Sequence, residues 1–201
     1  MKYFSTYNTD DEILQAFNDI YLKGCWYQAD ITYSKGIFYN KIKQPNEKYD
    51  LIPLFNDVIK QDSQLLDKMG NNSYKSIVFD PPFLFRNRKA ENNDKMCARF
   101  SYFKNYDDLL LMYENTLKSV YTKLSNGGYL FFKCQDMTDG KFYCTHYEII
   151  KMALKIGYQL KDIGIKISKT KLQREAKQQN CLAKTHSYWL VFKKQRGVKW
   201  N

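Results

Sequence analysis

The chain carries a stretch that combines an acid, two prolines and an aromatic residue, Asp80-Pro81-Pro82-Phe83. Residues 76–79 precede it, and their β-branched and aromatic content is typical of a short buried strand that the prolines then terminate. Because proline has a fixed φ and no N–H group, this turn can present a carboxylate and a preset carbonyl oxygen beside an aromatic ring. The combination suits chemistry on an amino group, whose two hydrogens need two oxygen acceptors.

That chemistry would be methylation of the exocyclic amino group of a nucleic-acid base. The amino nitrogen is a poor nucleophile because its lone pair is delocalised into the ring, and two acceptors on its hydrogens favour the pyramidal form that attacks. Asp80 and the Pro81 carbonyl would be the acceptors, and Phe83 would stack on the extruded base, returning about 1–3 kcal/mol of an extrusion cost of a few kcal/mol. Orientation and preset electrostatics would drive the transfer. The alternative interpretation is an ordinary strand-to-loop turn.

The periodicity of apolar residues predicts the elements that position this turn. Helices are expected over residues 9–23, 107–124 and 145–156, with Asn126-Gly127-Gly128 closing the second, and strands over residues 25–31, 76–79, 129–134, 158–167 and 187–192. Strands separated by helices indicate an α/β fold with a mostly parallel sheet, helices on both faces and ligands beyond the carboxyl ends of the strands. Without repeats or linker-like segments, residues 1–201 are expected to form a single domain.

The composition restricts the kinds of partner and the cellular compartment that we expect. Lys and Arg outnumber Asp and Glu by 32 to 21, and this net charge of +11 favours a polyanion such as nucleic acid, although an AT-rich genome would also enrich lysine. Five cysteines without a C-x-x-C pair or a histidine at a familiar ligand spacing predict a reduced intracellular protein and no metal site. The two histidines, His146 and His186, are expected to be structural. No signal peptide or run of about 18 apolar residues is visible, so we expect a cytoplasmic protein without membrane association.

The Asp-Pro-Pro-Phe stretch resembles motif IV of S-adenosylmethionine-dependent amino-methyltransferases that act on nucleic-acid bases. Four segments between about Asp30 and Phe192 are similar, more narrowly, to a group of small bacterial and phage methyltransferases. The resemblance implies a Rossmann-like class I methyltransferase fold, with a seven-stranded, mostly parallel sheet whose last strand is antiparallel. It also implies S-adenosylmethionine as the cofactor and adenine N6 in DNA as the target, because Asp at the head of the motif favours adenine over cytosine.

The same resemblance implies a cofactor-binding loop. The segment from Asp30 to residue 39 is similar to a family turn that contains an acid and a Thr-Tyr-Gly-x-Gly-like sequence. Asp30, Thr32, Tyr33 and Gly36 would therefore cradle the methionine part of S-adenosylmethionine. Ser34 stands where the family has its first glycine, so only Gly36 retains the close backbone approach.

Two further acids resemble family positions that hold the rest of the cofactor. Asp50 corresponds to the acid that ends the second strand and holds the ribose hydroxyls, which is a common solution to ribose binding. Asp62 corresponds to the later acid that contacts the adenine part. Asp57 is close enough in the sequence to compete with either assignment.

Target binding is expected from two segments. Residues 127–136 resemble a family block in which a strand ends in Lys-x-Gln-Asp, which makes Lys133 and Gln135 candidates for substrate contacts. The segment after the catalytic turn is basic and interleaved with aromatic residues, which suits a surface that follows phosphates and stacks bases. Its candidate residues are Arg86, Arg88, Lys89 and Arg99. No separate recognition domain is visible, so a homodimer or a partner subunit could supply further target contacts.

Three alternative functions remain open at this point. An RNA adenine or cytosine amino-methyltransferase would use the same motifs, because nothing in them distinguishes a 2′-hydroxyl, and competition between substrates would separate the two. A protein glutamine methyltransferase uses a similar turn, but it begins with Asn rather than Asp80. A non-catalytic nucleic-acid-binding protein with this fold is suggested by Ser34, and a failure to bind S-adenosylmethionine would support it.

Overall fold

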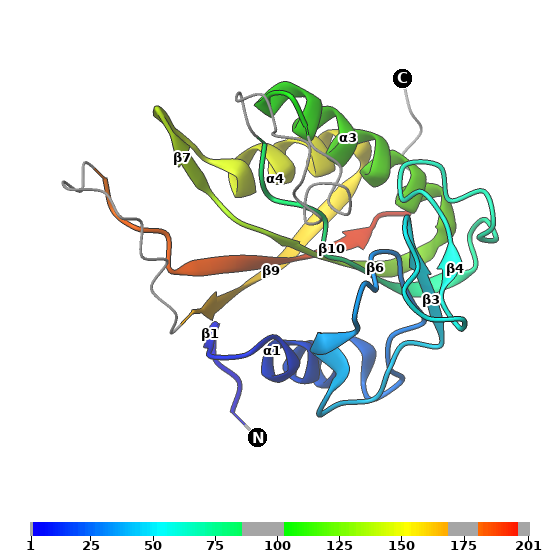
Figure 1. Cartoon of the computed structure of the whole chain (residues 1–201). Coiled ribbons are helices and arrows are strands. Elements are labelled where there is room, and N and C mark those ends of the chain that lie inside the picture. Colours follow the sequence, from blue (N-terminus) through cyan, green and yellow to red (C-terminus); the bar gives the residue numbers. More distant parts are fainter. Residues whose placement is uncertain (1, 86–102, 169–180, 197–201) are drawn as a thin grey trace.

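The computed structural model describes residues 2–85, 103–168 and 181–196, and a central sheet organises them (Figure 1). Within these residues the sheet has eight strands in the order β1-β9-β10-β6-β5-β2-β3-β4. Their bounds are Thr6–Tyr7 for β1, Ala29–Asp30 for β2, Glu47–Asp50 for β3, Ile59–Lys60 for β4, Tyr74–Phe79 for β5, Leu124–Cys134 for β6, Tyr158–Ile167 for β9 and His186–Lys194 for β10. A separate hairpin pairs β7, Met137–Asp139, with β8, Lys141–Tyr143.

In the described part of the chain, β10 is antiparallel to both of its neighbours and the other sheet strands run in one direction. The mostly parallel α/β sheet with an antiparallel last strand is therefore confirmed. The predicted count of seven strands is wrong, because the edge strand β1 pairs with β9, where Thr6 lies opposite Ile165. A strand of two residues is too short to show a periodic pattern in the sequence, so it is recognised only from its pairing with a neighbouring strand in the structure.

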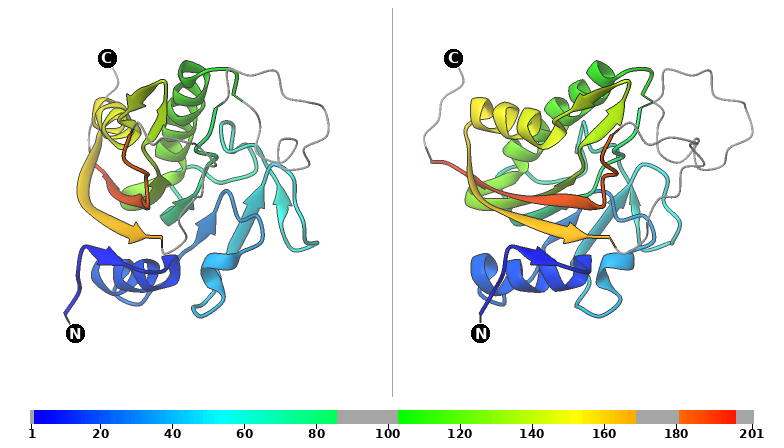
Figure 2. Two further views of the ribbon diagram at one scale, coloured as in Figure 1. Left: turned by 60° about the vertical axis from the view of Figure 1, so that its left-hand side comes forward. Right: turned by 90° about the vertical axis from the view of Figure 1, so that its left-hand side faces the viewer.

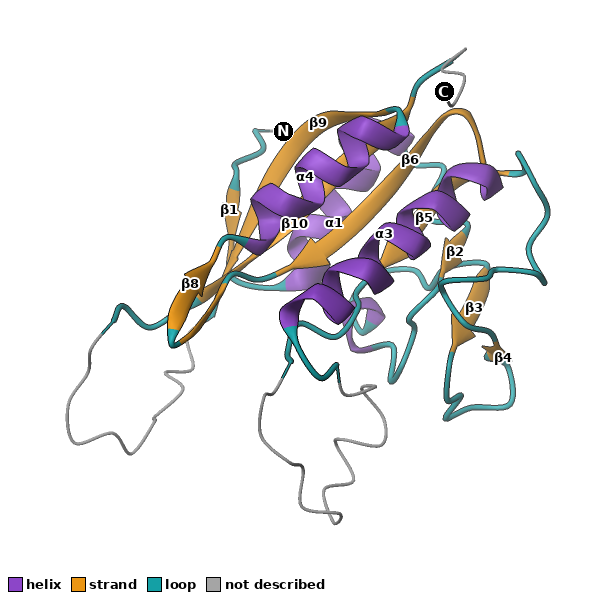
Figure 3. Cartoon of the chain, turned by 90° about the horizontal axis from the view of Figure 1, so that it is seen from above, coloured by secondary structure: helices purple, strands orange, loops and turns teal. Residues whose placement is uncertain are grey.

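Helices cover both faces of the sheet, as the sequence predicts (Figures 1 and 2). Their bounds are Asp10–Phe17 for α1, Tyr106–Lys123 for α3 and Thr145–Ile156 for α4, with a π-helical turn over Asn18–Leu22 and a 3-10 turn over Ile37–Tyr39. One apolar core lies between the sheet and α1, and another lies between the sheet and the pair α3 and α4, where α4 contacts β9 and β10 (Figure 3). Among the described residues, no helix combines the length and apolar character needed to cross a membrane.

The C-terminal end of α3 differs from the sequence prediction. The glycine pair at 127 and 128 does not close the helix, because β6 begins directly at Leu124. The buried ammonium group of Lys194, on β10, donates hydrogen bonds to the backbone oxygens of Tyr121 and Leu124 at 2.7 and 2.8 Å. A lysine that is distant in the sequence thus satisfies carbonyl groups that the helix leaves unpaired.

The parallel strands deliver acidic side chains to one edge of the sheet. β2 ends at Asp30, β3 ends at Asp50, and Asp80 follows the last residue of β5. The register places Asp30 opposite Val78, two residues before Asp80. Ligands of open α/β sheets bind beyond this edge, so the fold gathers three of the predicted site residues where a ligand would meet them.

Candidate functional site

The turn that begins with Asp80 is fixed to the loop that follows β2. The backbone N–H of Asp80 donates a hydrogen bond to the Thr32 hydroxyl oxygen at 2.7 Å. The side chain of Asp80 is 24% exposed, but its Oδ1 atom is enclosed and has no hydrogen-bond partner among the described residues. A buried carboxylate oxygen without a partner costs free energy, so such an atom marks a position where a ligand group can complete the hydrogen bonding.

The protonation of Asp80 depends on this enclosure. Burial raises the pKa of Asp80 from its ordinary 3.8 to about 6, because the charged form loses contact with water. The Lys133 ammonium, 3.9 Å from Asp80 Oδ1, opposes this rise in pKa, whereas the charge of Asp10 adds to it. At neutral pH, Asp80 is therefore mostly a carboxylate that can accept a hydrogen bond.

The rest of the turn is anchored from the other side. The hydroxyl of Tyr113, a buried residue of α3, donates a hydrogen bond to the Pro82 carbonyl oxygen at 2.7 Å. Phe85 is buried and its ring contacts the rings of Tyr106 and Tyr143, whereas Phe83 remains partly exposed. The structure thus holds the turn at both ends and leaves Phe83 partly exposed.

Lys133 lies inside the site, not on a surface that could follow phosphates. Only 7% of the residue is exposed, and its ammonium group lies 3.0 Å from Asp10 Oδ1 and 4.3 Å above the centre of the Phe38 ring. Asp10 also accepts a hydrogen bond from the Trp189 indole N–H at 2.9 Å. The Lys133 ammonium thus pairs with Asp10 and also lies 3.9 Å from Asp80 Oδ1. The sequence pattern missed Asp10, because an acid in the first turn of a helix indicates only a helix start.

The loop after β2 folds around the carboxylate of Asp30. This residue is 1% exposed, and it accepts hydrogen bonds from the Thr32 backbone N–H and the Tyr39 hydroxyl, both at 2.8 Å. Burial raises the pKa of Asp30 to about 7, although both hydrogen bonds act in the opposite direction. Asp30 therefore organises the loop from within, and Tyr39 is a loop residue that sequence reasoning did not assign.

Two residues of this loop adopt left-handed backbone conformations. Gly36 has φ +63°, and a Cβ atom at this position would lie 2.3 Å from the Tyr33 hydroxyl oxygen. The Tyr33 ring is buried and stacked on the Tyr39 ring at 5.8 Å, so it has little freedom to move. Ser34, which replaces a glycine of the resembled family, has φ +49° and donates its backbone N–H to Asp50 Oδ2 at 2.8 Å.

Gly36→Ala is expected to destabilise the fold by about 1–2 kcal/mol, because alanine is strained at positive φ and its methyl group meets Tyr33. For a chain of this size the unfolding temperature should fall by roughly 2–8 °C. Thermal unfolding followed by circular dichroism measures the change. Ser34→Gly is the matched control, because it removes left-handed strain and should not lower the unfolding temperature. Equal stability of Gly36→Ala and the unchanged chain would contradict this account of the loop.

The two acids predicted to hold the remainder of a cofactor lie in different surroundings. The Asp50 carboxylate accepts hydrogen bonds from the backbone N–H groups of Ser34 and Ile52, both at 2.8 Å, and thus joins the Asp30 loop. Asp62 accepts a hydrogen bond from the Gln64 backbone and lines a surface hollow with residues of α3 that include Lys118. The structure brings Asp50 to the site, whereas Asp62 belongs to the hollow beside α3.

The predicted target-binding residues are only partly described. Gln135 donates its side-chain amide to the His186 backbone oxygen at 3.0 Å, which connects the end of β6 to the start of β10. The remaining candidates lie outside the described residues: Arg86, Arg88, Lys89 and Arg99.

No protein-family model and no curated protein sequence matches this chain. Solved structures match it at the level of the fold. TrmN from Thermus thermophilus aligns over 92% of this chain and 48% of its own, with 12% identity and a TM-score of 0.52. The cytosine-N4-specific PvuII DNA methyltransferase aligns over 67% of this chain and 48% of its own, with 17% identity and a TM-score of 0.51. The [4+2]-cyclase SpnF aligns over 93% of this chain and 82% of its own, with 8% identity and a TM-score of 0.55.

The chain spans about half the length of TrmN, of the PvuII enzyme and of further matched chains. At these identities the likeness concerns the fold and leaves the reaction open, and the presence of a cyclase among the matches illustrates that one fold serves several chemistries. The mostly parallel sheet with its antiparallel β10 and the matches at the level of the fold support the same conclusion. This chain therefore has the Rossmann-like fold of methyltransferases, extended by one short edge strand.

Proposed function

We propose that this chain transfers the methyl group of S-adenosylmethionine to the exocyclic amino group of a nucleic-acid base, with adenine N6 in DNA as the target. The observation that carries the proposal is the Asp80 carboxylate, which follows a central parallel strand and keeps one enclosed oxygen without a hydrogen-bond partner among the described residues. The Asp-Pro-Pro-Phe sequence, the methyltransferase fold and the excess positive charge support the same reaction.

The residues at the sheet edge fit the proposed cofactor. The loop built on Asp30 presents backbone at Ser34 and Gly36 without a Cβ atom at the latter, and Asp50 supplies a carboxylate from the end of β3. When bound, S-adenosylmethionine supplies an electrophilic methyl group. Because the Thr32 hydroxyl accepts the Asp80 backbone N–H, this loop and the catalytic turn are held in fixed relation before any ligand binds.

The chain's own residues then act on the amino group. Asp80 and the Pro81 carbonyl accept hydrogen bonds from its two hydrogens and turn the nitrogen lone pair toward the methyl carbon. Transfer would form the nitrogen–carbon bond as the carbon–sulfur bond of the cofactor breaks with its electron pair left on sulfur, and the amino nitrogen would then lose a proton. Asp80 would take that proton and pass it to water. Lys133 stabilises the carboxylate form of Asp80 from within the protein.

The rate of methyl transfer should fall in acid. The carboxylate form of Asp80 is required, and the pKa of Asp80 is about 6, so the single-turnover rate should decline roughly tenfold per pH unit below that value. Rapid-quench measurements from pH 5 to pH 9, with thermal unfolding over the same range, separate protonation from loss of fold. A rate that stays constant from pH 8 to pH 5 would contradict the assignment of Asp80.

The proposed reaction is tested by transfer of a labelled methyl group to single-stranded DNA, double-stranded DNA and RNA, followed by nucleoside analysis. We expect N6-methyladenine in DNA. Label in RNA alone would move the target to RNA, and label in glutamine peptides would move it to protein. Absence of label in every polymer, with cofactor binding shown by calorimetry, would refute the proposed function for the chain alone.

A further inference from the structure

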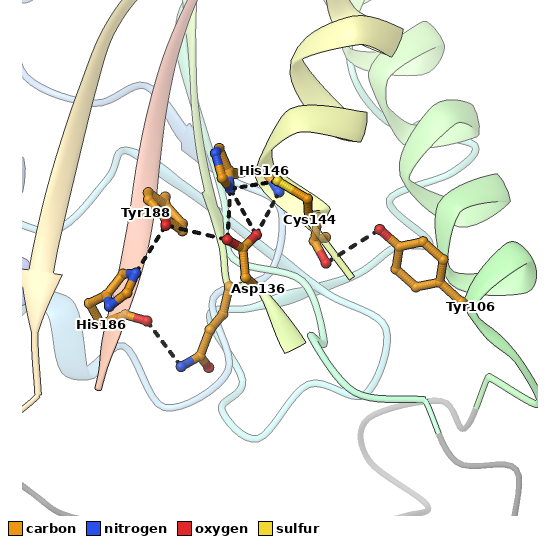
Figure 4. A network of polar contacts seen from close by, with 8 residues as sticks. Tyr106, Asp136, Cys144, His146, His186 and Tyr188 are labelled. Atoms are coloured by element: carbon orange, nitrogen blue, oxygen red, sulfur yellow. Dashed lines mark hydrogen bonds and ion pairs between the residues drawn. The ribbon is translucent and has the colours of Figure 1, made fainter. Parts of the chain in front are cut away.

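A second cluster of reactive side chains lies at the base of the β7–β8 hairpin, beyond the end of β6. Asp136 immediately precedes β7 and Cys144 immediately follows β8, so the pairing of Met137 with Tyr143 brings the two together. His146 joins them from the first turn of α4. Figure 4 shows the side chains of Asp136, Cys144 and His146 pointing toward one another. None of them takes part in the proposed methyl transfer.

The distances exclude one familiar use of these residue types. His146 Nδ1 lies 2.8 and 2.9 Å from the two carboxylate oxygens of Asp136, and Cys144 Sγ lies 3.8 Å from the same nitrogen. A nucleophilic relay needs the thiol on one ring nitrogen and the carboxylate on the other. Here both contacts end on one nitrogen, and the sulfur, nitrogen and oxygen donor atoms all lie within 4.8 Å of one another.

We propose that Asp136, Cys144 and His146 bind a divalent zinc ion and leave the fourth coordination position to water. Thiolate, imidazole and carboxylate are the ligand types that zinc takes in proteins, and together they carry a charge of −2 that the ion neutralises. Tetrahedral bond lengths require about 3.3 Å between the nitrogen and oxygen ligands and about 3.5 Å between nitrogen and sulfur. Side-chain rotations of a few tenths of an ångström convert the present distances into these.

Residues around the cluster hold two of the ligands in place. The Tyr188 hydroxyl, on β10, donates a hydrogen bond to Asp136 Oδ2 at 3.3 Å, and its ring stacks on the His146 ring at 4.3 Å. His186 Nε2 lies 2.9 Å from the Tyr188 hydroxyl and extends the network (Figure 4). Asp136 itself is 4% exposed. Such outer partners orient metal ligands and tune their basicity.

The competing interpretation is a helix cap. The His146 backbone N–H donates a hydrogen bond to Asp136 Oδ1 at 3.2 Å, so Asp136 also satisfies the start of α4 without any ion. A helix cap, however, does not need a cysteine beside the histidine. It also does not explain why Asp136 and Cys144 both contact His146 Nδ1. The two interpretations differ in a measurable way, because only a metal site requires the Cys144 sulfur.

The ion would fix the hairpin against Phe85 and the first residue of α3, Tyr106. Tyr143, the last residue of β8, packs its ring 5.0 Å from Phe85 and 4.5 Å from Tyr106. Cys144 adjoins Tyr143, so a metal ion bound at the hairpin base would limit movement of this ring cluster. The proposed role of the ion is therefore to hold this ring cluster in place.

The test uses the full chain, stripped of metal by a chelator, and titrates it with Zn²⁺ and with Co²⁺ as a spectroscopic probe. We expect one ion per chain, a four-coordinate visible spectrum for Co²⁺ and a near-ultraviolet absorption from the thiolate. Cys144→Ser should remove the thiolate absorption and weaken binding at least tenfold, and Tyr188→Phe should weaken binding about tenfold. Cys25→Ser, which changes an exposed cysteine elsewhere, is the matched control and should bind normally.

Two results would overturn the proposal. One is a chain that binds neither ion at a stoichiometry of one, which would leave Asp136 as a helix cap only. The other is a Cys144→Ser variant, folded by circular dichroism, that retains the affinity and the cobalt spectrum of the unchanged chain. Because neither readout uses methyl transfer, failure of this proposal and failure of the proposed function are distinguishable.

Discussion

Asp80→Ala is expected to reduce methyl transfer by about 10²–10³-fold, the range lost when one preset polar group of an active site is removed. The amino group would then lack the acceptor that turns its lone pair toward the methyl carbon, and its hydrogens would face an apolar methyl group. Single-turnover transfer of labelled methyl to DNA measures the loss. Cofactor affinity, measured by calorimetry, should change little, because the loop built on Asp30 does not use the Asp80 side chain.

A stability measurement separates this loss from misfolding. The folded state raises the pKa of Asp80 from 3.8 to about 6, so ionisation of this group destabilises the fold between about pH 4 and pH 6, and the full cost persists above pH 6. Asp80→Asn should therefore raise the unfolding temperature at pH 8 and have a smaller effect at pH 4. A variant that is inactive yet more stable than the unchanged chain has lost a group that the reaction needs and has not misfolded. Full activity in Asp80→Ala would refute the central assignment.

The position of Asp80 could be predicted because its signal is local. A short apolar run followed by an acid and two prolines fixes a strand end and a turn within a few residues, and the structure places the acid there. The bounds of α4 and β9 could also be predicted, because the spacing of apolar residues changes at Gly157, which lies between them. The resemblance to methyltransferases then predicted the fold, and the strand order confirms it.

The partners of Asp80 could not be predicted, because they come from distant parts of the chain. Asp10 lies in the first turn of α1, where an acid indicates only a helix start, and the sequence predicts Lys133 as a substrate contact near the end of a strand. Their ion pair exists only once α1 packs on the sheet beside β6. The cluster at Asp136 was missed for a different reason: its members lie within ten residues of one another, but three-residue strands such as β7 and β8 show no sequence pattern that would predict the hairpin.

Lys133→Met is expected to shift the pH dependence of methyl transfer toward alkaline values. The ammonium group lowers the pKa of Asp80, so its removal lets that pKa rise further above 6 and protonates Asp80 at neutral pH. Activity at pH 7 should fall and should recover as the pH is raised toward 9. A role of Lys133 in binding phosphates would instead weaken DNA affinity at every pH, so rate and affinity measured over the same pH range decide between the two.

The same variant should also lose stability, because it leaves Asp10 as a buried charge without its main partner. Removing one member of a buried ion pair costs about 3–5 kcal/mol, and the side chains of Lys133 and Asp10 are 9% and 11% exposed. The double variant Asp10→Asn with Lys133→Met removes both charges and keeps an oxygen that can accept the Trp189 indole N–H. It should recover most of the lost stability. Its pH profile should lie between those of Lys133→Met and the unchanged chain, because the substitution of Asp10 also removes a charge that raises the pKa of Asp80. Since the Lys133 ammonium has the larger effect on that pKa, full recovery of the original pH profile would mean that Lys133 acts on Asp80 through the fold and not through its charge.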